Sequence, residues 1–310
     1  MSSSEAPGES TVAAAPPWRE RPTWGFEEGD EIAPGRTVLR RLGGGRRYEV
    51  HLVWDDARLA VLVAKLLRPD QAADAGALGD LRREASALAQ LAHPVVVRGF
   101  DAVLSGPHPH LLIEHLEGPT LRALLEDSGP LALEQLLPLA LHVAAALHYM
   151  AGEGWVHLDV KPDNIVMGVP PRLIDLSVAR TIARARRASG PIGTDAYMAP
   201  EQCDPRAAPG RVGPPADVFG LGATLYHALT GRRPFPRPRG ARESADPAER
   251  FPQLVRAPEP LGRRVPDRLA HAIMATLAPA PEDRPAAAEL ARALEPLVAG
   301  LPQRMVLGRR

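Results

Sequence analysis

The sequence predicts an α+β fold, in which a five-stranded sheet with one helix is followed by a mainly helical part. Short apolar or alternating runs, broken by glycine and aspartate, follow one another from about residue 36. Helical periodicity dominates after about residue 118. A length of 310 residues, of which 45% are hydrophobic, allows two domains or one two-lobed unit with a sizeable core.

The strands and the helix of the first part are each marked by their own pattern. One helix is predicted over Asp80–Ala92, because leucine and alanine recur there on one helical face. The predicted strands on either side of it are Thr37–Leu42, Tyr48–Trp54, Leu59–Leu67, Val95–Leu104 and Leu111–His115.

The second part is read as helices joined by loops. Residues 215–230 are apolar nearly all round and end at Gly231, which predicts a helix buried on every side. Residues 232–266 are rich in proline and arginine and predict a loop region with room for a short helix. The other predicted helices are 131–152, 266–278 and 285–298.

Residues 1–33 predict a leader that is disordered or loosely docked, because serine, alanine, proline and glutamate dominate without a steady period. The pattern of a signal peptide is missing. Trp18, Trp24 and Phe26 are candidates to pack on the folded body. Residues 299–310 are expected to form a short tail.

Charge and cysteine content exclude several classes of function. The 37 basic and 37 acidic residues cancel, so we expect no nucleic-acid partner and no polybasic membrane anchor. The sequence contains no run of 18 apolar residues, so no membrane helix is predicted, and we expect a cytoplasmic protein. Cys203 is the one cysteine, which excludes an internal disulfide framework and a cysteine-rich zinc site; we expect it to be buried.

Lysine and asparagine are so rare that their positions are informative. Lys65 and Lys161 are the only lysines against 35 arginines, and Asn164 is the only asparagine. Arginine replaces lysine on most surfaces at little cost, so the remaining lysines indicate places that need a compact ammonium.

The run HLDVKPDNIV, from His157 to Val166, carries groups suited to phosphoryl transfer. Asp159 offers a carboxylate for an attacking hydroxyl, Lys161 a cation and Asn164 a metal ligand. A turn over Gly168–Pro171 predicts a hairpin that brings Asp175 beside Asn164, where the two oxygens suit a hard cation. The alternative is a capped turn with surface charges.

These stretches resemble the catalytic and magnesium-binding loops of the eukaryotic-like serine/threonine protein kinases of bacteria. The resemblance covers about residues 36–298, and its motifs occur in the family's order. They include LEGPTLRALLEDSGPL, GTDAYMAPEQ (Gly193 to Gln202), ADVFGLGATLYHALTGRRPF (Ala216 to Phe235) and PEDRPA (Pro281 to Ala286). It implies a bilobal kinase domain over 34–298, with an antiparallel sheet in a first lobe (34–115) and a helical second lobe (118–298).

The resemblance also implies a role for individual residues. Asp159 is the catalytic base and Lys161 contacts the phosphoryl group. Gly193, Thr194 and Tyr197 shape the acceptor site. Asn164 and Asp175 hold Mg²⁺, or Mn²⁺ in its place. The residues that it implies for ATP binding are Gly43, Gly45, Val50, Lys65, Glu84, Glu114 and His115. Two structural roles are implied as well: Glu201 pairs with Arg284, and Asp217 braces the catalytic loop.

The sequence departs from the family pattern at positions that leave other functions open. Tyr48 stands where the third glycine of the glycine-rich loop is usual, Leu158 replaces an arginine, and Leu176-Ser177 replace phenylalanine and glycine. The expected partners are ATP and proteins with serine or threonine acceptors. The alternatives are a pseudokinase that acts as a nucleotide-binding scaffold, and a phosphotransferase for small molecules.

Overall fold

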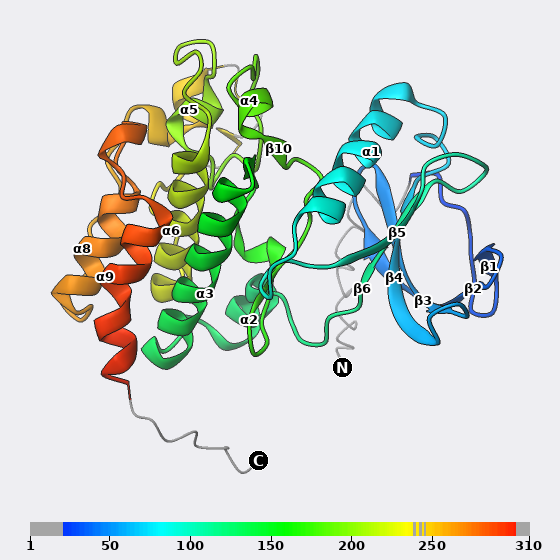
Figure 1. The fold of residues 1–310 in the computed structure, drawn as a ribbon. Helices are drawn as coiled ribbons and strands as arrows, with labels where there is room; N and C mark the ends of the chain where they lie inside the picture. Colours follow the sequence, from blue (N-terminus) through cyan, green and yellow to red (C-terminus); the bar gives the residue numbers. More distant parts are fainter. Residues whose placement is uncertain (1–20, 238–239, 242–243, 245, 302–310) are drawn as a thin grey trace, which may run out of the picture. The chain divides into compact units, whose positions relative to one another are not determined.

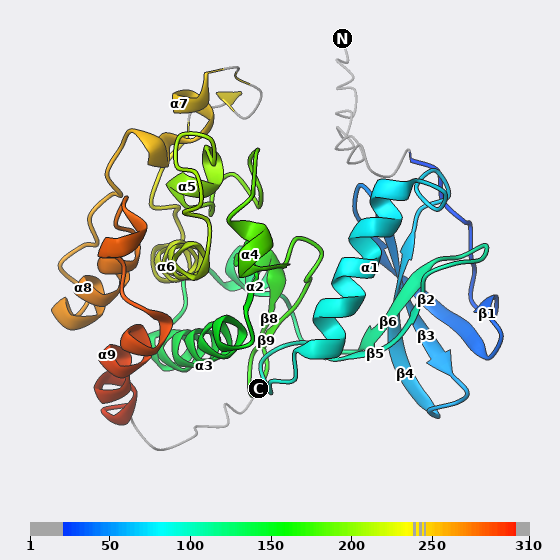
Figure 2. The same ribbon diagram turned by 45° about the horizontal axis from the view of Figure 1, so that its top comes forward.

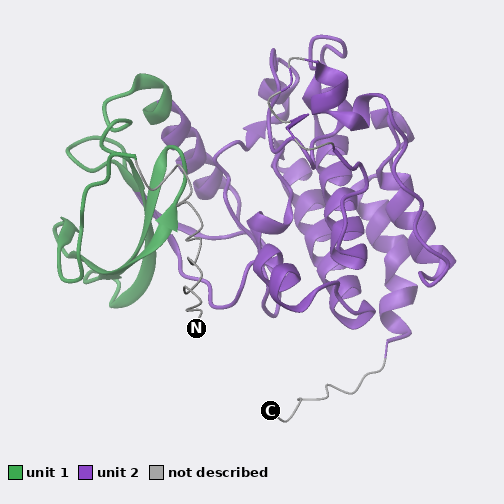
Figure 3. Ribbon diagram, turned by 180° about the vertical axis from the view of Figure 1, so that it is seen from behind, with its two compact units in different colours: residues 1–78, 103–110 green, residues 79–102, 111–310 purple. Residues whose placement is uncertain are grey.

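The computed structural model describes residues 21–237, 240–241, 244 and 246–301, and its chain forms two compact units (Figure 3). Unit 1 comprises 1–78 and 103–110, and unit 2 comprises 79–102 and 111–310, as far as these are described. The division between the units falls within helix α1 (Ala75–Gln90). The units are therefore described one at a time.

Unit 1 is built on an antiparallel sheet. Strands β2, β3 and β4 pair in succession, and the short strand β1 adds to the outer side of β2. Among the described residues the sheet has six strands, which are the five predicted ones and the additional short strand β1. The strands of unit 1 are β1 (Glu31–Ala33), β2 (Arg36–Gly44), β3 (Tyr48–Asp55) and β4 (Ala60–Leu67), whereas β5 (Gly99–Val103) and β6 (His110–Glu114) consist mostly of residues assigned to unit 2.

The described part of the leader packs on this sheet. Trp24 donates from Nε1 to the carbonyl oxygen of Leu67 at 2.8 Å, and the ring of Phe26 meets those of His51 and His108 edge-on. The predicted packing of Trp24 and Phe26 is therefore confirmed, whereas Trp18 lies outside the described residues.

Unit 2 is mainly helical. Helix α3 packs against α6 and α9, and α8 packs against the same two helices (Figures 1 and 2). Helix α6 is buried along most of its length and ends before Gly231, as its apolar sequence predicts. The longer helices of this unit are α2 (Leu121–Ser128), α3 (Leu133–Gly152), α6 (Pro214–Thr230), α8 (Asp267–Thr276) and α9 (Ala287–Ala299).

Short elements connect these helices and carry the candidate site. The predicted hairpin is present, because β8 pairs antiparallel with β9. In a separate small sheet, β10 pairs antiparallel with β7. These elements are β7 (Trp155–Val156), η2 (Pro162–Asn164), β8 (Ile165–Val166), β9 (Arg172–Leu173), β10 (Arg180–Thr181), α4 (Ile182–Ala185), α5 (Pro200–Cys203), α7 (Pro247–Arg250), η4 (Pro252–Leu254) and η5 (Pro281–Asp283).

Helix α1 begins five residues before its predicted start. Asp74 lies just ahead of the helix, and its Oδ1 accepts a hydrogen bond of 2.7 Å from the backbone N–H of Ala77. Such a cap satisfies an amide of the first turn and so extends the helix toward its N-terminus.

Within the described part of the chain, no helix is both long and apolar enough to cross a membrane.

Candidate active site

The catalytic-loop sequence lies between β7 and β8, and a side chain of helix α6 holds it by hydrogen bonds. The carboxylate of Asp217 accepts hydrogen bonds from the backbone N–H groups of His157 (2.8 Å) and Leu158 (2.6 Å). Burial raises the pKa of Asp217, while the charge of His157 and these two hydrogen bonds oppose the rise. The predicted bracing role of Asp217 is thus confirmed.

Asp159 has one engaged and one unengaged carboxylate oxygen. Its Oδ2 accepts from Lys161 Nζ at 2.6 Å and from Asn164 Nδ2 at 3.1 Å. Its Oδ1 is buried and has no hydrogen-bond partner within the described residues. A buried carboxylate oxygen without a partner is costly, so such an atom at a site indicates a place for a donor.

The segment that contains Gly193 and Thr194 is attached to this loop. Lys161 donates from Nζ to Thr194 Oγ1 at 2.6 Å, the same distance as to Asp159. Gly193 has a φ of +117°, and a β-carbon there would lie 2.6 Å from the carbonyl oxygen of Leu158. Only glycine allows the two backbones to approach this closely.

Gln202 also holds this segment, although the sequence analysis assigned no role to it. Its Nε2 donates to the carbonyl oxygens of Leu158 (2.9 Å) and Ile192 (2.8 Å), and its side chain is buried. The signal was present, because Gln202 ends the motif GTDAYMAPEQ. The long-range partners of an amide side chain cannot be read from its own sequence.

The hairpin brings the backbones of Asn164 and Asp175 together, since the N–H of Ile174 donates to the carbonyl oxygen of Asn164 at 2.9 Å. Asn164 Nδ2 donates to Asp159, which leaves Oδ1 as the ligand atom of the amide. Asp175 accepts at Oδ1 from the N–H of Ser177 at 3.4 Å.

An amide oxygen and a carboxylate fit Mg²⁺, which commonly takes one or two protein ligands and completes its shell with phosphate and water oxygens. Across the described residues there is no group of three or more histidine, cysteine, aspartate or glutamate side chains that could hold a metal ion. The two-residue donor set therefore suits a nucleotide-bound cation better than a structural metal ion.

Three of the nucleotide-binding candidates of unit 1 lie in register across neighbouring strands of the sheet, whereas Gly45 lies in the turn after β2. Gly43 pairs with Val50 across β2 and β3, and Val50 pairs with Lys65 across β3 and β4. Partners in register project their side chains to the same face. Lys65 is 8% exposed, and its Nζ lies 4.5 Å from the centre of the Tyr48 ring. Tyr48 thus supports the lysine from the position where the family pattern has glycine.

Two further residues shape the glycine-rich turn and were not identified from the sequence. A β-carbon on Gly44, which has a φ of +155°, would lie 2.5 Å from the carbonyl oxygen of Tyr48. The fully buried Arg68 donates from Nε to Gly45 O (2.8 Å) and from Nη1 to Pro22 O (3.0 Å). Arg68 therefore links the turn to the segment before the sheet.

The remaining candidates lie in unit 2. Glu84 is buried on α1, at 2% exposure, and Lys65 belongs to the other unit, so their pairing stays a prediction. The carboxylate of Glu114 pairs with Arg172, and its N–H donates to the carbonyl oxygen of Arg98. His115 is partly exposed.

Two structural predictions about unit 2 are confirmed. Arg284 forms a bidentate ion pair with Glu201, with Nη1–Oε1 at 2.7 Å and Nη2–Oε2 at 2.9 Å, and both side chains are buried. Cys203 is buried as expected, and burial raises the pKa of its thiol, ahead of the charges of Asp195 and Glu201.

Comparisons with known proteins point in one direction. The family model described as protein kinase domain matches residues 36–293. The serine/threonine-protein kinase PknB of Mycobacterium leprae is 34% identical over 203 residues, which are 63% of this chain and 32% of PknB.

Two more relatives carry similar names. Serine/threonine-protein kinase PkaA of Streptomyces coelicolor is 33% identical over 244 residues, 76% of this chain and 43% of PkaA. The probable serine/threonine-protein kinase PkwA of Thermomonospora curvata is 34% identical over 262 residues, 84% of this chain and 33% of PkwA. The chain thus aligns with about a third to two fifths of these relatives' lengths.

Proposed function

The chain belongs to the protein kinase family, and from this premise we propose that it transfers the γ-phosphoryl group of ATP to serine and threonine hydroxyls of proteins. The observation that carries the proposal is the buried Oδ1 of Asp159, which has no partner in the described structure. The names of the bacterial relatives support serine and threonine as acceptors.

Asp159 acts as the base of this reaction. Its Oδ1 accepts the proton of the substrate hydroxyl while the hydroxyl oxygen bonds to the γ-phosphorus. The bond from that phosphorus to its bridging oxygen breaks, and ADP leaves. Lys161 and Asn164 hold the other carboxylate oxygen, so Oδ1 keeps a fixed direction.

Lys161 serves the phosphoryl group as well as the base. Its side chain is 16% exposed, and its ammonium donates to Asp159 and Thr194, which places a positive charge beside the acceptor position. A cation at this point stabilises the negative charge of the transferring phosphoryl oxygens. Gly193 and Thr194 shape the place where the acceptor side chain lies.

The proposed metal ligands are Asn164 Oδ1 and the carboxylate of Asp175. The cation they would hold, Mg²⁺ or Mn²⁺, supplies charge neutralisation for the phosphate oxygens when it is bound. ATP is the proposed donor, and its use favours a cytoplasmic site of action and a signalling role. The residues proposed to contact ATP or position its contacts are Gly43, Gly45, Val50, Lys65, Glu84, Glu114 and His115.

The domain that performs this reaction is proposed to span 34–298, with lobes over 34–115 and 118–298. A pseudokinase scaffold is the alternative, and the substitutions at Tyr48, Leu158 and Ser177 motivated it. None of the three removes a charge that phosphoryl transfer needs, and Lys65, Asp159, Asn164 and Asp175 are all present. No proposed partner is a nucleic acid or a membrane.

One experiment separates these functions. The protein is incubated with Mg²⁺ and ATP labelled in the γ-phosphate, together with a general protein substrate, and the labelled amino acids are identified. We expect phosphoserine and phosphothreonine. ATP binding without transfer would indicate the pseudokinase, and label on small alcohols such as aminoglycosides, but not on protein, would indicate the small-molecule enzyme.

A further inference from the structure

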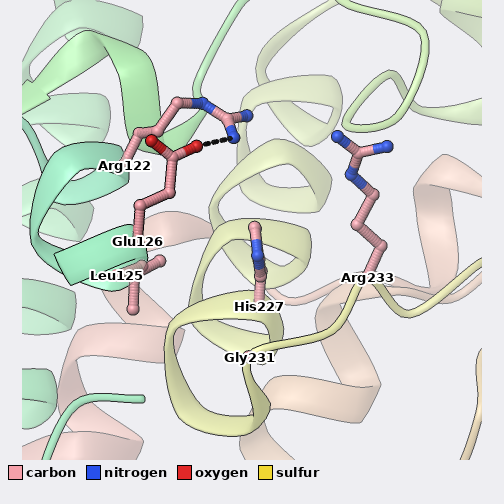
Figure 4. Close-up of a pocket in the computed structure, with 6 residues that line it drawn as sticks. All are labelled: Arg122, Leu125, Glu126, His227, Gly231 and Arg233. Carbon is pink, nitrogen blue, oxygen red and sulfur yellow. Dashed lines mark hydrogen bonds and ion pairs between the residues drawn. The ribbon is translucent and has the colours of Figure 1, made fainter. Parts of the chain in front are cut away.

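Unit 2 contains a pocket that none of the candidate site residues lines (Figure 4). It has a volume of about 300 Å³ and lies between α2, the end of α6 and the loop that follows α6. His227 stands between the side chains of Arg122 and Arg233 (Figure 4). The lining residues are Arg122, Leu125, Glu126, His227, Gly231 and Arg233.

Two chains of contacts join this pocket to the acceptor position. Tyr197 forms a hydrogen bond of 2.7 Å with His227 Nδ1, and its N–H donates to the carbonyl oxygen of Thr194 at 2.8 Å. On the other side, Arg122 donates from Nε to Asp163 at 2.7 Å, and Asp163 lies between Lys161 and Asn164 in sequence. A peptide whose hydroxyl lies at Asp159 would therefore have its neighbouring residues near the pocket.

Arg233 is the cation of this pocket that lacks a carboxylate partner among the described residues. Arg122 is already neutralised by Asp163 and by Glu126, the latter at 3.2 Å (Figure 4). Arg233 lies 6.0 Å from the centre of the Tyr197 ring. No carboxylate of the described residues forms an ion pair with Arg233, so its positive charge remains for a ligand.

The imidazole of His227 supplies an uncharged N–H donor beside the guanidinium of Arg233. Burial, followed by the charges of Arg233 and Arg122, lowers the pKa of His227 below its ordinary value, so the ring is neutral at pH 7. In the tautomer in which Nδ1 accepts from the hydroxyl of Tyr197, the ring proton lies on Nε2, which can donate to a ligand. A cation and an adjacent N–H group together suit a carboxylate.

We propose that this pocket binds the carboxylate of an aspartate or glutamate that lies within a few residues of the phosphorylated serine or threonine. The proposal rests on the proposed function and specifies its substrate class, proteins with acidic residues beside the acceptor. A basic side chain is disfavoured, because it would face the unneutralised guanidinium of Arg233. A phosphorylated residue would meet the same donors.

Peptide substrates test the proposal directly. In an uncharged serine peptide, glutamate is placed in turn at each of about four positions on either side of the serine, a reach of roughly 13 Å. A peptide with glutamine at the same position is the reference for each one. We expect kcat/KM to be about fivefold higher, or more, for glutamate at one of these positions. Phosphoserine at that position shows whether a phosphate is accepted as well.

Matched variants assign the preference to the pocket. Arg233→Gln should bring the glutamate-to-glutamine ratio of kcat/KM close to one, and Arg233→Glu should turn the preference toward arginine at the same position. Arg232→Gln removes the same charge one residue away from the lining, and we expect it to keep the ratio of the wild type. Thermal melting confirms that each variant is folded.

The outcomes distinguish failure of the pocket proposal from failure of the proposed kinase function. Ratios near one at every position in the wild type, or a preference that survives Arg233→Gln, would overturn the inference while leaving the kinase activity intact. Failure to phosphorylate any peptide would count against the proposed function instead. Binding of fluorescent glutamate and glutamine peptides, measured without ATP, then still decides whether the pocket selects a carboxylate.

Discussion

Lys161 and Thr194 are joined by a hydrogen bond of 2.6 Å between Nζ and Oγ1, although 33 residues separate them in sequence. The same ammonium holds the carboxylate of Asp159. The position of the proposed base therefore depends on the segment that shapes the acceptor site. We therefore expect that segment to affect catalysis directly, without a phosphate to order it.

Thr194→Ala should lower kcat by about tenfold or more, because a hydrogen bond to a charged group is lost. Thr194→Ser keeps the hydroxyl and should restore most of the rate. The double variant Thr181→Ala/Ser189→Ala should keep most of its initial rate on an exogenous protein, since the side chain of Leu158 has no donor to bind a phosphate on this segment. A dead double variant, together with loss of wild-type activity after phosphatase treatment, would show that phosphorylation is required.

Asp175→Ala and Asn164→Ala should each reduce phosphoryl transfer by about a hundredfold or more while the fold survives. The readout that does not depend on activity is thermal melting with ATP. In the wild type, ATP should raise the melting temperature only when Mg²⁺ is present, and Asp175→Ala should weaken the shift. Equal stabilisation by ATP with and without the metal would remove these residues from a cation site.

Lys65→Arg should lower phosphoryl transfer by about tenfold or more, because a planar guanidinium replaces a compact ammonium at a position that is 8% exposed. We expect near-normal thermal stability, so that the loss belongs to the reaction. The sequence contains 35 arginines, which makes intolerance of arginine here informative. Full activity of this variant would exclude Lys65 from the ATP site.

We expect Glu49 to make the stability of unit 1 depend on pH. Burial alone would raise the pKa of Glu49. Hydrogen bonds from His51, Thr23 and the N–H of Trp24 together lower it by more than burial raises it, so the pKa lies below its ordinary value. A carboxyl with a depressed folded pKa stabilises the fold above its unfolded pKa of about 4.3. That stabilisation is lost as the pH falls from this value through the folded pKa.

Comparison with Glu49→Gln isolates this contribution, since all other acidic groups are common to both proteins. At pH 7 the variant should be destabilised by about 3 kcal/mol, because fully buried Arg68, whose Nη1 lies 3.7 Å from Glu49, loses its counter-charge. Denaturant unfolding should show the difference shrinking below about pH 4.3. A difference that stays constant down to pH 3 would contradict the assignment.

Local patterns were enough to predict the centre of the candidate site. Asp159, Lys161 and Asn164 lie within six residues, and a short turn is enough to bring the strand before Asp175 back beside them. The buried helix α6 was likewise evident, because a helix that is apolar all round has no face for solvent. In these cases, the signal and the structure that it specifies lie in the same stretch of chain.

Contacts between distant residues could not be predicted in this way. Arg68 bonds the carbonyl of Pro22, 46 residues away, and Gln202 bonds that of Leu158, 44 residues away. Neither partner is visible in the composition around the side chain that donates. Strand β1 was missed for a similar reason, since three residues are too few to show a period and its pairing with β2 defines it.

The central claim is that Asp159 is the base of a phosphoryl transfer, and one comparison tests it most directly. Transfer from ATP with Mg²⁺ to protein serine and threonine is measured for the wild type, for Asp159→Asn and for Asp127→Asn, which neutralises an exposed carboxylate at the end of α2. We expect Asp159→Asn to lose about a hundredfold or more of the rate while still being stabilised by ATP, and Asp127→Asn to match the wild type. A rate for Asp159→Asn close to that of the wild type would contradict the account.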